Sequence, residues 1–130
     1  MGELSFGDQV ARVTSAVLDL YHLYSQRPGW DLEVELESGP HGALSITGTG
    51  ARPALPGPSQ LVVAYLDEPA EVVIDGVRGR LVPAESTLSL VEIGQGRVRI
   101  TGTLHTTWRA RDEDPRPYAI GFDIDAALVT

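Results

Sequence analysis

The sequence predicts an α+β fold, mainly β, in which one N-terminal amphipathic helix precedes about eight antiparallel strands. Three observations lead to this prediction: apolar residues recur at helical spacing near the N-terminus, they alternate from residue 31 onward, and glycine- and proline-rich turns separate the alternating stretches. The strands would form a curved sheet, a sandwich or a small barrel. At 130 residues the chain fits a single domain, 1–130, with the helix at about 5–26 and the β region at about 31–129.

The helix is predicted from an N-terminal signal and an apolar stripe. Ser5-Phe6-Gly7-Asp8 resembles an N-cap with an acidic residue three positions later. The helix would end near Arg27-Pro28-Gly29, because proline disfavours helical geometry in the residue before it. The stripe would face the core, and it comprises Val10, Val13, Val17, Leu20 or Tyr21, and Tyr24.

The middle of the chain predicts two hairpins and one covered strand. Residues 31–37 alternate, with Leu32, Val34 and Leu36 on one face, and residues 44–48 continue them after a turn. The continuous apolar run 61–66 predicts a strand that is covered on both faces, with the helix on one side. Residues 72–74 and 77–82 flank Asp75-Gly76, a dipeptide that tolerates the positive φ angles of a tight hairpin turn.

The last third of the chain predicts one long hairpin formed by residues 97–111 and 118–129. The turn-rich segment 112–117 separates the two stretches. In the first stretch Val98, Ile100, Leu104 and Trp108 fall on one face, and polar residues such as His105 fall on the other. One face would therefore build a core, and the other would meet water or a partner.

Composition excludes several classes of function. The chain has no cysteine, so disulfides, thiolate metal sites and cysteine nucleophiles are excluded. Its net charge is −8, and residues 1–75 carry 11 acidic residues against 3 arginines, whereas residues 76–130 carry 7 of each. Such acidity disfavours nucleic acid and anionic membranes and favours a basic protein partner. All 10 positive residues are arginine, which indicates a GC-rich bacterial coding genome.

Neither a membrane-spanning stretch nor a signal peptide is predicted. No apolar run approaches the length of about 18 residues that a spanning helix needs, and Met1-Gly2-Glu3 leads into no basic region with an apolar segment after it. We therefore expect a cytoplasmic protein. No motif predicts a cofactor or a metal site.

The acidic row on the strand 31–37 is the first candidate site. Asp31, Glu33, Glu35 and Glu37 would lie on one face at steps of about 6.6–6.8 Å, twice the rise per residue. They would steer a basic partner, with Trp30 or Trp108 as an aromatic anchor and the loop 50–60 alongside. The alternative is a solvated face, or one that Arg97 and Arg99 neutralise within the chain if the strands are neighbours.

The final hairpin supplies the second candidate site. Keeping both apolar faces together would set His105 opposite Asp123 or Asp125, and a carboxylate beside an imidazole suits acid–base chemistry. On a solvent face the same pair would be an ordinary cross-strand ion pair. If the polar face lined a barrel lumen, these residues would form a pocket; the candidates for lining a ligand pocket are Trp108, Arg109 and Tyr118.

Three functions follow from these features. The first is a non-enzymatic module that binds a basic protein, for example an inhibitor of the immunity or antitoxin kind, and the absence of catalytic motifs favours it. The second is a small barrel that binds an apolar molecule, as a cyclase or isomerase with a His105/Asp123 acid–base pair. The third is a subunit of a homo-oligomer that self-associates through the edge of the final hairpin.

Overall fold

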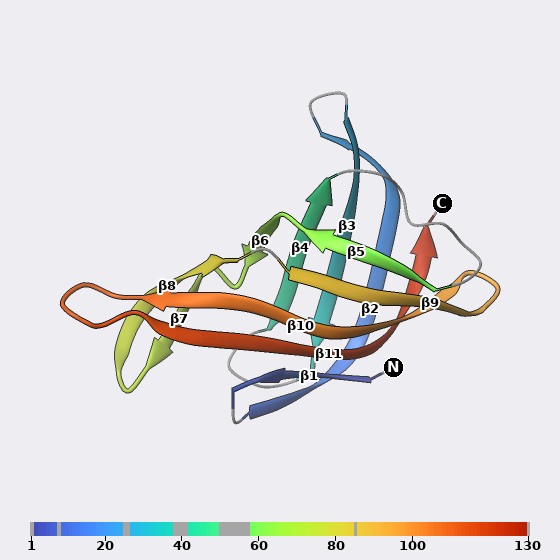
Figure 1. Ribbon diagram of the computed structural model, residues 1–130. Coiled ribbons are helices and arrows are strands. Elements are labelled where there is room, and N and C mark those ends of the chain that lie inside the picture. Colours follow the sequence, from blue (N-terminus) through green and yellow to red (C-terminus); the bar gives the residue numbers. More distant parts are fainter. Residues whose placement is uncertain are drawn as a thin grey trace.

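The computed structural model shows an all-β protein whose main sheet curls into a nearly closed barrel (Figure 1). It describes residues 2–7, 9–24, 27–37, 42–49, 58–84 and 86–129, and the side chains of residues 21–24, 27, 28 and 49 are not described. The eleven strands are β1 Gly2–Phe6, β2 Gln9–Tyr24, β3 Arg27–Leu36, β4 Ala43–Thr49, β5 Ser59–Val63, β6 Tyr65–Glu68, β7 Glu71–Ile74, β8 Val77–Pro83, β9 Ser86–Gly94, β10 Arg97–Arg109 and β11 Arg116–Val129.

The predicted α+β class is wrong, because no helix occurs in the described residues and the segment predicted as helix forms β1 and β2. A register shift in the pairing of β2 with β3, between Val13 and Ser15, explains the error. A bulge adds one residue and moves the inward phase, so the buried residues Val13, Ala16 and Leu20 are spaced as on a helix, whereas Val10 of the predicted stripe is exposed. The buried side chains described on β2 are Ala11, Val13, Ala16, Leu18 and Leu20.

The barrel closes through one segment that pairs on both sides. The strand order is β5-β9-β10-β11-β1-β2-β3-β4-β6, and β5 and β6 are consecutive along the chain. The amide of Ala64, between these two strands, donates a hydrogen bond to the carbonyl of Thr47 on β4 (2.8 Å). We call Ser59–Glu68 the closing segment, since it joins β9 to β4.

The closing segment differs from the covered strand that was predicted for residues 61–66. Leu61 and Val63 point into the core, whereas Val62 and Tyr65 are exposed. Since no helix among the described residues covers the outer face, only one face of the segment is buried. A continuous apolar run is therefore not a sufficient sign of a strand buried on both faces.

Both hairpins of the second half are confirmed. β7 and β8 pair antiparallel around Asp75 (φ 52°) and Gly76 (φ 81°), the positive angles that the dipeptide predicted. β10 and β11 pair along nearly their whole length. The β7–β8 hairpin attaches to the barrel through pairing of β8 with the end of β10.

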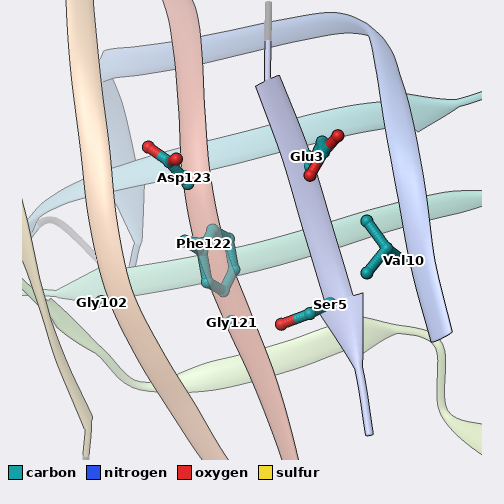
Figure 2. Close-up of a pocket in the computed structure, with 7 residues that line it drawn as sticks. All are labelled: Glu3, Ser5, Val10, Gly102, Gly121, Phe122 and Asp123. Carbon is teal, nitrogen blue, oxygen red and sulfur yellow. The ribbon is translucent and has the colours of Figure 1, made fainter. Parts of the chain in front are cut away.

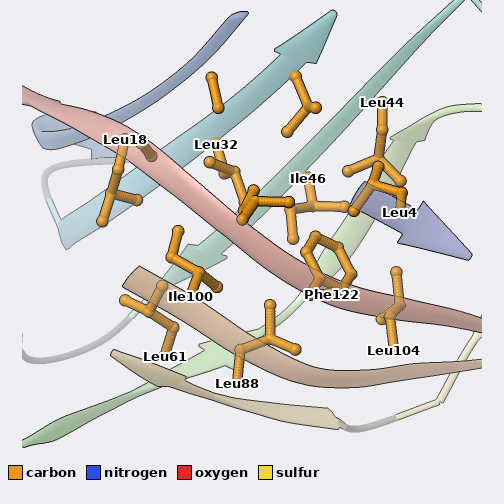
Figure 3. Packing of buried hydrophobic residues seen from close by; sticks show 14 of the residues in the cluster. Leu4, Leu18, Leu32, Leu44, Ile46, Leu61, Leu88, Ile100, Leu104 and Phe122 are labelled. Carbon is orange, nitrogen blue, oxygen red and sulfur yellow. The ribbon is translucent and has the colours of Figure 1, made fainter. Parts of the chain in front are cut away.

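The barrel interior is filled with side chains. Inward-facing residues from the strands around the barrel form one cluster that packs across the lumen (Figure 3). A smaller cluster of Val72, Leu81 and Trp108 lies where the β7–β8 hairpin meets β10. Leu66 and Tyr118 contact both clusters. The described residues thus form a packed hydrophobic core at the centre of the barrel.

Candidate functional site

The predicted acidic row lies on the outer surface of the barrel. On β3 the side chains of Leu32, Val34 and Leu36 are buried, so the alternating carboxylates face outward, with Glu33 and Glu35 exposed. Glu37, just beyond β3, forms an exposed ion pair with Arg12; the distance from Nη1 of Arg12 to Oε2 of Glu37 is 3.6 Å. The last carboxylate of the predicted row is thus paired with an arginine of the same chain.

The neighbours of Glu33 and Glu35 are small, and this creates a groove. Val17 on β2 and Ser45 on β4 flank Glu33, while Ser15 and Ala43 flank Glu35 in the same way. These side chains are shorter than the glutamates, so a groove of about 370 Å³ opens along this outer face. The glutamates therefore border a hollow and do not stand on a flat sheet.

Barrel closure adds two more carboxylates to this surface. Asp67 and Glu68 lie on β6, which pairs with β4, and Glu68 lines the groove. Burial raises the pKa of Asp67, and the negative charges of Asp31 and Glu68 raise it further, against a hydrogen bond from Ser45. We call Asp31, Glu33, Glu35, Asp67 and Glu68 the acidic face.

The arginines that were considered as neutralising partners are elsewhere. Arg97 and Arg99 lie on β10, which is not a neighbour of β3 in the sheet. Arg99 instead bridges two carboxylates of β11: its Nη1 donates to Asp125 (2.6 Å), and its Nη2 contacts Asp123. This bridge holds the pKa of Asp125 below its ordinary value. Glu33, Glu35 and Glu68 form no ion pair within the described part of the chain.

Trp30 and Trp108 belong to the core and not to the partner surface. Trp30 is buried opposite Gly48 of β4, and Trp108 is fully buried under the β7–β8 hairpin. The indole N–H of Trp108 donates to the carbonyl of Val72 (2.9 Å). Neither ring offers the exposed aromatic anchor that was expected. The expected contribution of the loop 50–60 lies mostly outside the described residues.

The predicted pairing of His105 with an acid is wrong. The register sets His105 opposite Ala119, while Asp123 is opposite Thr101 and Asp125 is opposite Arg99. His105 is exposed on the outer face, and so it does not line a lumen. Both predicted registers are therefore wrong, and the observed register is shifted by four residues from the nearer of them.

Asp123 lies instead beside a shallow outer hollow of about 190 Å³ (Figure 2). Its partner in the neighbouring strand is Glu3 of β1. The floor is low because Gly102 and Gly121 have no side chains, and Ser5 covers part of it. The carboxylate of Asp123 is bound by Arg99, so this hollow does not supply an acid–base pair with His105.

The three ligand-pocket candidates are divided between two faces. Trp108 and Tyr118 share the smaller cluster, whereas Arg109 is exposed on the outer face, opposite Arg80 of β8. Tyr118 lines a cleft of about 410 Å³ between β7 and the turn that joins β1 to β2. Sequence reasoning missed the other walls of this cleft, because Phe6 was assigned to a helix and Val72 to a distant hairpin.

Comparison with known proteins identifies no relative. No protein-family model matches the chain, and no curated protein or solved structure matches it significantly. The described residues also include no helix that is long and apolar enough to cross a membrane.

Proposed function

We propose that this protein is a non-enzymatic binding module that holds a basic protein partner on its acidic face, in the cytoplasm. The observation that supports this most is the groove between β2, β3 and β4, bordered by Glu33, Glu35 and Glu68 without a compensating cation in the described chain. An inhibitor that covers the working surface of a basic protein is one form of such a module.

The chemistry of the groove favours arginine side chains. Each carboxylate accepts two parallel hydrogen bonds from a planar guanidinium, and the small flanking side chains of Ser15 and Ser45 leave space for it. The long apolar stem of arginine would pack on Val17 and Ala43. The groove would form the centre of a larger interface, because stable protein complexes bury about 1,200–2,000 Å² in total.

The acidic face would act on the rate of association as well as on affinity. Like charges gathered on one surface produce a field that steers an oppositely charged partner toward it. Because exposed charges are screened by salt, binding should weaken steeply as ionic strength rises. Self-association through the final hairpin has less support, since β10 and β11 each have a strand on both sides over much of their length in the described structure.

The test compares two double variants with the same net charge. Glu33→Gln with Glu35→Gln removes the centre of the acidic face, and Glu3→Gln with Glu92→Gln removes two carboxylates from other strands. Each immobilised protein is offered a host lysate at low salt, and the captured proteins are released at high salt and quantified by mass spectrometry. We expect a basic protein at near-stoichiometric amount on the wild type and on the second variant.

Loss of that protein only from the Glu33/Glu35 variant would support the proposal. An equal loss from both double variants would show that capture depends on net charge alone, which contradicts a defined site. Full retention by the Glu33/Glu35 variant would exclude the acidic face as the binding surface.

A further inference from the structure

The cleft between β7 and the β1–β2 turn has features of a small-molecule site. Its volume of about 410 Å³ falls within the range of ligand pockets, roughly 300–1,000 Å³. Phe6 at the end of β1, Ile74 on β7 and Tyr118 on β11 all line it. Its lining residues come from both hydrophobic clusters: Phe6 belongs to the larger one and Val72 to the smaller one.

Apolar side chains line the cleft, and they pack on the hydrophobic core. Phe6 and Val72 are buried, and the ring of Tyr118 contacts both hydrophobic clusters. Burial raises the pKa of the Tyr118 hydroxyl, so it remains protonated and uncharged at neutral pH. Trp108 holds the hairpin in place through its hydrogen bond to Val72 (2.9 Å). The walls are therefore fixed by the core before any ligand arrives.

One wall of the cleft is a strand edge with hydrogen-bonding capacity. Among the described residues β7 pairs only with β8. Ile74 and Val77 flank the two-residue turn and so form a hydrogen-bonded pair. Four residues further along the ladder, the Leu81 amide donates to the Ala70 carbonyl (2.9 Å), as expected if every second pair is hydrogen-bonded. Hydrogen-bonded pairs alternate with non-bonded ones, so the N–H and C=O of Val73 point away from β8.

At the rim of the cleft one arginine, Arg116, faces two carboxylates, Asp75 and Glu113. Asp75 lines the cleft, and Nη1 of Arg116 lies 3.1 Å from Oδ2 of this carboxylate. Arg116 is in turn held over the ring of Trp108, 5.3 Å from its centroid. An anionic ligand would be repelled by Asp75 and Glu113, and a cationic ligand would compete with Arg116 for them, so the cleft favours a neutral ligand.

We propose that this cleft binds a small, neutral, planar molecule that carries a cyclic amide. Its ring would fill the apolar space between Phe6, Ile74 and Tyr118. Its adjacent N–H and C=O would exchange two hydrogen bonds with Val73, as a residue of a neighbouring antiparallel strand would. The site is separate from the acidic face, and the two proposals stand or fall independently.

The first test uses 2-quinolone, a bicyclic lactam, with N-methyl-2-quinolone as the matched probe without the donor. Each is titrated into the ¹⁵N-labelled full chain, and amide chemical shifts are followed. We expect saturable shifts at Val73, Ile74 and the residues around Phe6 and Tyr118. The methylated probe should bind about tenfold more weakly, which corresponds to the loss of one hydrogen bond.

Two variants and a control make the result decisive. Val73→Pro removes only the N–H that points away from β8, and it should weaken 2-quinolone about tenfold. Gln9→Trp places a large ring at the mouth of the cleft and should abolish binding even if the proline variant does not fold. Gln60→Trp, an exposed glutamine on β5, is the control and should bind like the wild type.

Equal affinity for the two probes would overturn the hydrogen-bonding role of Val73. Shifts that saturate elsewhere on the barrel, or binding that Gln9→Trp and Gln60→Trp affect equally, would overturn the site itself. The absence of any saturable shift up to the solubility limit of 2-quinolone would do the same.

Discussion

The indole ring of Trp108 lies against Gly79, so closely that a Cβ atom added to this glycine would be 2.2 Å from Cε2 of the ring. Trp30 has the same relationship to Gly48, at 2.3 Å. In each case the tryptophan and the glycine are on adjacent strands, and the large ring covers the space that the missing side chain leaves. Both tryptophans of the chain are thus buried against a glycine of the neighbouring strand.

Gly79→Ala should therefore destabilise the protein by about 1–3 kcal/mol, because the added methyl group displaces a fully buried ring. The matched control is Gly94→Ala, since nothing lies within 4 Å of a Cβ at that position. We expect the control to change the free energy of unfolding by less than about 0.5 kcal/mol. Urea denaturation followed by tryptophan fluorescence measures both, and similar values for the two variants would contradict the close contact.

Removing charge from the acidic face should stabilise the fold slightly. Two unit charges about 6.7 Å apart repel by about 0.6 kcal/mol in water, before screening. Glu33→Gln with Glu35→Gln should therefore raise the free energy of unfolding by about 0.5 kcal/mol at 10 mM salt, and by much less at 500 mM salt. Urea denaturation at both salt concentrations checks this. A loss of stability would show that the carboxylates have structural partners.

Asp67 and Asp125 should affect the pH dependence of stability in opposite directions. The pKa of Asp67 is raised in the folded protein, so the unfolded chain loses this proton first, and its contribution to stability falls as pH rises above about 3.8. The pKa of Asp125 is lowered, mainly by its hydrogen bond from Arg99, so its contribution is present above about 3.8 and is lost at lower pH.

The difference in free energy of unfolding between pH 7 and pH 3 should therefore be more favourable at pH 7 in Asp67→Asn than in the wild type. In Asp125→Asn it should be less favourable at pH 7 than in the wild type. Thermal unfolding between pH 3 and pH 7, compared with the wild type at each pH, measures these differences. The same direction of change in both variants would contradict the assigned environments.

His105→Gln should leave stability unchanged within about 0.5 kcal/mol, because the side chain is exposed on the outer face. The backbone of this residue forms two hydrogen bonds: its amide donates to Oγ of Ser86 (2.9 Å), and its carbonyl accepts from the amide of Ala84 (2.9 Å). Ser86→Ala removes the acceptor of the first bond and should cost about 1 kcal/mol. Chemical denaturation of the two variants separates the side chain of His105 from its backbone. A large effect of His105→Gln would indicate a role that its position does not explain.

The sequence predicted the features that depend on local pattern. The alternation of residues 97–109, the Asp75-Gly76 turn and the outward row of Glu33 and Glu35 all follow from spacing along one strand. The prediction of a helix over β2 was wrong because of the bulge near Val13. One extra residue there interrupts the period of two and gives an apparent helical spacing.

The parts of the site that sequence could not supply are those that depend on barrel closure. Glu68 joins the acidic groove only because β6 pairs with β4, and Phe6 meets Ile74 only because the hairpin attaches to the end of β10. No spacing rule relates these residues. The register of β10 and β11 was similarly open, since shifts by an even number of residues preserve both apolar faces.

The pairing of β1 with β11 has a consequence for synthesis of the chain. Phe6 lies opposite Ile120, and Gly2 lies opposite Ile124, so β1 is completed by a strand that is translated much later. Leu4, although translated early, reaches its buried position only when residues 116–129 have left the ribosome. Until then the growing chain exposes an open sheet edge and an apolar surface. A molecular chaperone would bind this surface during that period.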